Sequence, residues 1–336
     1  SGEVADVKRQ RQREKFVAVL SGEVADLNRL RTLCWAGCDE EHRPDTWRLL
    51  LRYMPGNKGR REEKMAGLRS EYGEAVANYF DKYNPDSADE YHRVMYNQIA
   101  VDLPRTNPSM PLFQSPRVHA SLHRILYLWA IRHPGTGYVQ GINDLVTPFF
   151  FVFLREATHR QHDDATIASG RLLHTLSPDT LAHVEADCYH CLTNMLDNAQ
   201  DNYVVDFKGI QEKVFRLKRI IRRLDDALVA HLDHHNVDFI QFAFRWFNCL
   251  LMRELSMACT LRLWDAYVAD KQFAAFHVYV CAAVLLAFSD DLKAMDFQDM
   301  IMFLQKLPTH HWEASQMEVI LAQAYAWAEQ FSLSHI

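Results

Sequence analysis

Apolar side chains recur three and four residues apart along most of this chain, and nowhere do they alternate convincingly with polar ones as strands require. Glycine and proline, which interrupt helices, are scarce, at 12 and 11 of the 336 residues. Both features favour long helices. We therefore predict an all-α fold with no sheet, in a chain long enough for one large or two smaller domains.

Charge and hydropathy argue against several functional classes. The net charge is −6, so no basic field attracts nucleic acid. The longest apolar runs, residues 145–154 and 276–288, fall short of the roughly 20 residues that cross a bilayer. The basic segment 8–15 does not resemble a secretory signal, and the seven cysteines, an odd number, indicate reduced thiols. We expect a cytoplasmic protein.

Two polar residues, Arg105 and Gln140, stand where local signals end or start a helix. Pro104, Pro108 and Pro111 forbid a regular helix around Arg105, because proline lacks an amide donor and restricts the residue before it. A Pro-Gly-Thr-Gly turn precedes Gln140, and an apolar run follows it. We predict a loop at Arg105 and a first helical turn near Gln140, both suited to reach a partner.

The helix leading to Arg105 has its own start signal. Ser87 and Glu90 have the spacing of a capping box, with Ser87 as the cap. The helix that follows delivers the chain to Asp102. Residues 158–168, in contrast, are polar and indicate a loop.

We divide the chain into three parts: an arm at 1–26, a first lobe at 27–200 that carries Arg105 and Gln140, and a second lobe at 201–336. Residues 201–209 are the expected joint between the lobes. The hexapeptide at residues 1–6 recurs at 21–26, either as an engineering scar or as a local duplication.

Three sets of residues have metal-ligand chemistry. Cys188 and Cys191 have zinc-like spacing, but zinc needs four ligands and no second pair follows, so core cysteines are the better interpretation. The other two sets are Cys34, Cys38 and His42, and His159, His162, Asp163 and Asp164. Because all-α metal phosphohydrolases use a His-Asp pair, the last set leaves a distant alternative function open. Its polar surroundings favour a surface loop, and we expect no metal.

Residues 239–254 are apolar nearly all round a helix and must be buried. The charges within this segment, among them Arg245 and Glu254, therefore need partners. Structural pairing explains them better than catalysis does.

Judged by spacing alone, Arg105 and Gln140 have purely structural roles. Arg105 is then a loop arginine with a salt bridge, and Gln140 is a helix-capping glutamine. No glycine-rich phosphate loop with its Lys-Ser/Thr signature is present, so the chain is not expected to bind nucleotide by itself. A wider pattern of motifs gives the two residues a different meaning.

The sequence around both residues resembles the two finger motifs of the TBC-domain family, the GTPase-activating proteins of Rab GTPases. Further blocks of that family run in order from about residue 27 to 330, and the branch they resemble is typified by a yeast Golgi Rab activator. The matching blocks are Arg43-Pro-x-x-Trp47, Ile99-x-x-Asp102-x-x-Arg105, residues 132–144 with Tyr138-x-Gln140-Gly141, Pro148-Phe149-Phe150, residues 241–248, residues 251–254 and Arg262-Leu-Trp-Asp265.

The resemblance implies a V-shaped, all-helical domain of two lobes that acts on a Rab GTPase in its GTP form. It implies that Arg105 and Gln140 are catalytic fingers supplied in trans, while GTP and Mg²⁺ come with the partner and the chain needs no cofactor of its own. A Rab-binding scaffold without a useful rate is the alternative. Contact with Golgi or other trafficking membranes is then expected through partners.

We expect six residues to support the two fingers. Asp102 could orient Arg105 or hold its loop, Tyr138 anchors the turn of Gln140, and Gly137 and Gly141 let the backbone approach phosphates. The other two, Arg43 and Trp47, are expected to buttress the same loops.

Overall fold

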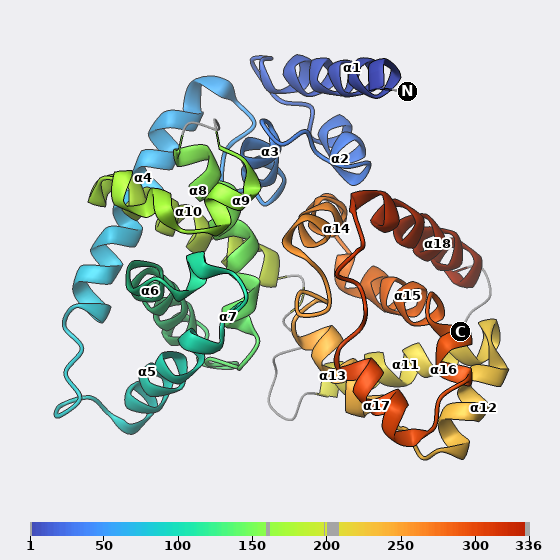
Figure 1. The fold of residues 1–336 in the computed structure, drawn as a ribbon. Helices are drawn as coiled ribbons and strands as arrows, with labels where there is room; N and C mark the ends of the chain where they lie inside the picture. The colour runs from blue at the N-terminus through green and yellow to red at the C-terminus, as the bar shows by residue number, and fades with distance from the viewer. Residues whose placement is uncertain (1, 159–161, 198, 200–207, 333–336) are drawn as a thin grey trace. The chain divides into compact units, whose positions relative to one another are not determined.

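A computed structural model of the chain describes residues 2–158, 162–197, 199 and 208–332. Within these ranges the regular structure is entirely helical, apart from one isolated antiparallel bridge between Val24 and Asn57 (Figure 1). The predicted all-α class is confirmed. The chain forms two compact units. One comprises Ser1–Asp197 with Asp265–Lys271, and the other comprises Asn198–Trp264 with Gln272–Ile336.

In the first unit, α10 packs on α4, α6 and α8, and α5 packs on α6. Short 3₁₀ turns connect several of its helices, and a π-helical turn, Val76–Phe80, continues α4. The helices of this unit are α1 (Gly2–Leu20), α2 (Leu27–Trp35), α3 (Arg43–Leu50), α4 (Arg61–Ala75), α5 (Glu90–Asp102), α6 (Pro116–Arg132), α7 (Ile142–Leu145), α8 (Thr147–Ala157), α9 (Asp164–Ala168) and α10 (Pro178–Leu196).

The centre of this unit contains a buried carboxylate, Asp187 on α10. Arg48 and Arg69 donate to it at 2.8 and 2.7 Å, and the Tyr53 hydroxyl donates at 2.6 Å. Burial by itself would raise the pKa of Asp187, but the hydrogen bonds and the two guanidinium charges outweigh burial and lower it. The side chain is therefore held as an anion that ties α3 and α4 to α10.

In the second unit, α15 packs on both α11 and α18, and α11 also packs on α12 and α13. Its helices are α11 (Lys208–Leu224), α12 (Asp226–His234), α13 (Ile240–Asn248), α14 (Met257–Ala269), α15 (Phe273–Leu286), α16 (Ser289–Lys293), α17 (Phe297–Gln305) and α18 (Ala314–Ser332). The last residues of α14, from Asp265 on, belong to the first unit.

Two local predictions are wrong. The cap of α5 is Asp89, whose carboxylate accepts from the amide of His92 at 2.9 Å, rather than Ser87. The segment 158–168, predicted as a loop, contains the short helix α9, which Asp163 caps through the amide of Thr166. Most of the expected joint at 201–209 lies outside the described residues, and Lys208 and Gly209 belong to α11.

Candidate functional site

The segment that carries Arg105 is a tight turn directly after α5. Leu103–Arg105 forms a 3₁₀ turn in place of the predicted loop, with Pro104 near its start, where a missing amide donor costs nothing. The Arg105 side chain is exposed, and it makes no ion pair with any residue that the structure describes. Its guanidinium is therefore available to an external group.

The segment that carries Gln140 joins α6 to α7. It contains two glycines with positive φ, Gly137 at +62° and Gly141 at +110°. A Cβ at Gly137 would lie 3.3 Å from Sδ of Met95, so both backbone conformation and space favour glycine there. Gln140 is exposed between the two turns, while Gly137 and Gly141 are buried.

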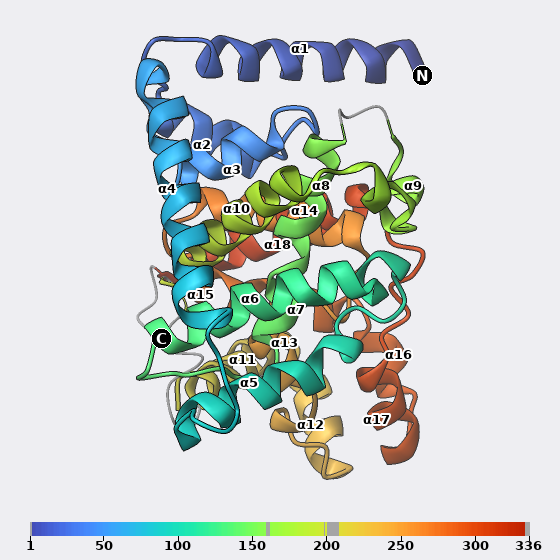
Figure 2. The same cartoon turned by 90° about the vertical axis from the view of Figure 1, so that its left-hand side faces the viewer.

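These two segments are hydrogen-bonded to each other through Asp102 and Tyr138. The Tyr138 hydroxyl donates to Oδ2 of Asp102 at 2.8 Å, and the two residues are only 5% and 6% exposed. Asp102 lies at the end of α5, three residues before Arg105, and Tyr138 lies two residues before Gln140. Figures 1 and 2 show the three helices that present these segments, α5, α6 and α7, side by side.

A second hydrogen-bonded chain runs through Thr106 and Asn143. The Thr106 hydroxyl donates to the carbonyl of Asp102 at 3.0 Å and accepts from Nδ2 of Asn143 at 2.8 Å. Oδ1 of Asn143 in turn accepts from the amide of Gly141 at 2.9 Å. Thr106 and Asn143 are fully buried. Two separate sets of buried hydrogen bonds therefore join the segments of Arg105 and Gln140.

The sequence reasoning did not assign a role to Thr106 or Asn143. One signal was present, since Asn143 and Asp144 are polar residues directly before an apolar helical run. A buried amide must find hydrogen-bond partners, and the nearest polar segments are the sensible places to look for them.

Arg43 and Trp47 share one hydrogen-bond acceptor, Asp265 at the end of α14. Both side chains donate to the carboxylate of Asp265, Arg43 through Nε and Nη2 at 3.0 Å each and Trp47 through Nε1 at 2.8 Å. Burial would lower the pKa of the Arg43 guanidinium, but the charge and hydrogen bonds of Asp265 outweigh it and raise the pKa above its usual range. The pair anchors α3 to the end of α14.

Members of two other candidate metal-ligand sets lie on α10 and α9. Cys188 and Cys191 are fully buried on α10. Asp163 is the cap of α9 and Asp164 pairs with Arg155 at 2.5 Å, while His159 lies outside the described residues. In the second unit, Arg245 pairs with the buried Glu254, as expected of a charge in that apolar segment.

Two further features bear on function. A cavity of 1260 Å³ lies between α4, α6 and α10, but neither Arg105 nor Gln140 lines it. No helix in the described part of the chain is long and apolar enough to cross a membrane.

Residues 40–293 match the family model of the Rab-GTPase-TBC domain, and the chain belongs to that family. The resemblance read from the finger motifs is therefore confirmed. Human TBC1 domain family member 22B is 44% identical over 328 residues, which cover 97% of this chain and 63% of the relative. The GTPase-activating protein gyp1 of Schizosaccharomyces pombe is 45% identical over 322 residues, covering 95% of this chain and 61% of that protein.

A solved structure extends the likeness to three dimensions. The crystal structure of the Ypt/Rab-GAP domain of Gyp1p has a TM-score of 0.88 and 40% identity, and the match covers 96% of this chain and 99% of that one. The chain spans between 61 and 63% of the length of these two curated relatives, and so corresponds to part of each.

Proposed function

We propose that this chain accelerates hydrolysis of GTP on Rab-type GTPases, with Arg105 and Gln140 as catalytic fingers supplied in trans. The proposal is supported by one observation above all. Both side chains are exposed, on two segments that buried hydrogen bonds join. The S. pombe relative is named as a GTPase-activating protein.

GTP hydrolysis places growing negative charge on the phosphoryl oxygens and the leaving oxygen. The chemistry needs positioning and electrostatic stabilisation more than covalent help. Arg105 offers a permanently charged planar fork, which Lys cannot reproduce. Gln140 offers an amide donor and acceptor that together can hold the attacking water. An arginine finger contributes about 10³–10⁵ in rate.

The partner is proposed to bring GTP and Mg²⁺, and the chain to act on its GTP form. The lobe at residues 27–200 would carry both fingers, with Asp102 and Tyr138 fixing their segments. Gly137 and Gly141 would supply the positive-φ turns on either side of Gln140. Arg43 and Trp47 would contribute less directly, by holding Asp265. Action at trafficking membranes would follow from the location of the partner.

The test is phosphate release from a panel of GTP-loaded Rab proteins with substoichiometric activator. Wild type should turn over many partner molecules, Arg105→Ala should lose nearly all stimulation, and Gln140→Ala should lose much of it. Arg105→Lys should stay close to Arg105→Ala, because a point charge cannot replace the fork.

Matched controls are Arg171→Ala and Gln330→Ala, which remove the same side chains from exposed positions elsewhere. Both should behave as wild type. If wild type stimulates none of the Rab proteins but binds one, the chain is a scaffold. If the finger variants keep the wild-type rate, the two residues are not the fingers.

A further inference from the structure

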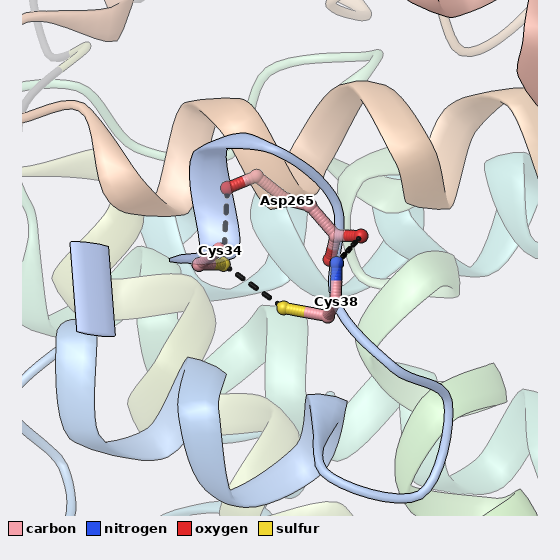
Figure 3. A group of neighbouring side chains, drawn as sticks. All are labelled: Cys34, Cys38 and Asp265. Atoms are coloured by element: carbon pink, nitrogen blue, oxygen red, sulfur yellow. Dashed lines mark hydrogen bonds between the residues drawn. The ribbon is translucent and has the colours of Figure 1, made fainter. Parts of the chain in front are cut away.

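Two cysteine side chains lie in direct contact at the end of α2. Sγ of Cys38 lies 3.0 Å from Sγ of Cys34 (Figure 3). A disulfide has its sulfurs at about 2.05 Å, so a movement of about 1 Å would bring this pair to bonding distance. Rotation of two side chains can supply much of a movement of that size.

The backbone explains how residues four apart meet outside a regular helix. α2 ends at Trp35, and the amide of Gly37 donates to the carbonyl of Cys34 at 2.9 Å. Gly37 has φ +105°, a conformation that side chains disfavour. This turn brings Cys38 back over the last turn of α2.

The other closely spaced pair in the sequence provides a contrast. Cys188 and Cys191 have the spacing common in redox motifs, but both are completely buried on α10. No hydrogen bond joins these two thiols in the described part of the chain. Contact and access, rather than spacing, single out Cys34 and Cys38.

We propose that Cys34 and Cys38 are a redox modification site that forms a reversible intramolecular disulfide. The residue Cys38 keeps some exposed surface although its thiol is largely desolvated, whereas Cys34 is fully buried. Cys38 is therefore the entry point and Cys34 the resolving thiol. The oxidant class is a small disulfide such as oxidised glutathione.

Exchange proceeds in two steps. The Cys38 thiolate attacks one sulfur of oxidised glutathione, which forms a mixed disulfide and releases one glutathione thiolate. The Cys34 thiolate then attacks Sγ of Cys38 and releases the second. The two protein thiols lose two electrons, one oxidised glutathione gains them, and both thiol protons end on the released glutathione.

A metal site is the competing use of the same residues, since Asp265 lies beside both sulfurs. Its carboxylate, however, already accepts from the Arg43 guanidinium, the Trp47 indole and the Cys38 amide, at distances between 2.8 and 3.0 Å. A cation there would have to displace or repel Arg43. The geometry therefore favours sulfur–sulfur chemistry over metal ligation.

The rate of the first step depends on how much of Cys38 is present as thiolate. Burial raises the pKa of the Cys38 thiol well above its ordinary range, and the hydrogen bond to Cys34 and the charge of Asp265 raise it further. Little of the attacking thiolate is present at neutral pH, so the first step is slow.

The experiment equilibrates the folded chain in glutathione buffers of increasing oxidised fraction, followed by quenching, denaturation and alkylation. No lysine or arginine separates Cys34 from Cys38, so trypsin leaves both on one peptide. We expect that peptide to lose both labels and become two hydrogens lighter, while total labelling falls from seven thiols to five. Dithiothreitol should restore all of them.

Single variants test the assigned order. Cys34→Ser should stop at a mixed disulfide carrying one glutathione on Cys38, and Cys38→Ser should remain unmodified at Cys34. Cys188→Ser is the matched control and should still form the bond between residues 34 and 38.

Three results would overturn the proposal. They are full labelling of the Cys34–Cys38 peptide at every buffer composition and after diamide, a bond at Cys188 and Cys191 instead, or zinc that copurifies with wild type and is lost from both single serine variants.

Discussion

The Tyr138 hydroxyl lies 2.8 Å from Oδ2 of Asp102 and joins the segment that ends in Arg105 to the segment that leads to Gln140. Both members of this pair are buried, whereas Arg105 and Gln140 are exposed. The placement of two surface side chains therefore depends on a hydrogen bond in the interior. That dependence can be tested without touching either exposed residue.

Tyr138→Phe removes only the donor and leaves Asp102 buried with an unmet acceptor. We expect a loss of about 1–3 kcal/mol in the free energy of unfolding, measured by urea denaturation. If the proposed function holds, stimulated phosphate release should also fall, by up to about 10²-fold, because small misplacements of catalytic groups are costly. Tyr79→Phe, at a residue 54% exposed, should change neither quantity.

The Thr106–Asn143 hydrogen bond predicts coupling between two sequence-distant residues. Thr106→Val and Asn143→Ala should each destabilise the protein, and the double variant should lose less than their sum. A coupling free energy of about 0.5–3 kcal/mol is expected from a double-mutant cycle in urea. Strict additivity would show that the two side chains act independently.

Asp187→Ala should be among the most destabilising single substitutions in the first unit. The substitution removes one of the carboxylates that pair with Arg48 and the carboxylate that pairs with Arg69. We expect the free energy of unfolding to fall by about 3–5 kcal/mol. Asp179→Ala, on the exposed first turn of the same helix, should cost about 1 kcal/mol or less. Equal unfolding midpoints for the two variants would contradict the assigned role of Asp187.

Buried neutral histidines should make the fold sensitive to mild acid. Burial lowers the pKa of His277 from 6.5 to about 3 and that of His123 to about 4. Below pH 6.5 the unfolded chain binds protons that the folded chain excludes, so stability is complete above that pH and falls as pH falls. The expected slope is about 1.4 kcal/mol per pH unit for each histidine.

The measurement is urea unfolding at several pH values between neutral and mildly acidic. His277→Gln can retain a donor for the Trp246 carbonyl, which His277 contacts at 2.8 Å, but cannot take up a proton. Its stability should therefore vary less with pH than that of wild type. His310→Gln, at an exposed position, is the control and should leave the dependence of unfolding free energy on pH as in wild type. If both variants show the same dependence, His277 is not its source.

Helical periodicity was sufficient to predict the fold class, because most helices bury one face and the apolar residues of that face recur every three to four positions. Helix ends were harder. Ser87 and Asp89 are both good capping residues. The cap is the one whose side-chain oxygen comes within hydrogen-bond distance of a free amide in the first helical turn. Sequence alone has no measure of that distance.

The candidate site also contains residues with local sequence signals and residues without them. Motif and turn signals are local, and they were enough to single out Arg105, Gln140, Asp102 and Tyr138 as candidates. The partner of Trp47 was missed because it lies 218 residues along the chain, and no spacing rule connects them. Asn143 was missed because its two partners are fixed only after α7 and the turn at Thr106 have formed.

The pairing of Arg43 with Asp265 limits how this chain can be shortened. A fragment that stops near residue 200 would keep the guanidinium and the Trp47 indole but lose the carboxylate that both of them hold. Two donors that the fold buries against Asp265 would lose their acceptor, and the fragment should misfold or aggregate during expression. Deletion mapping of partner binding would then report misfolding rather than the location of a contact surface.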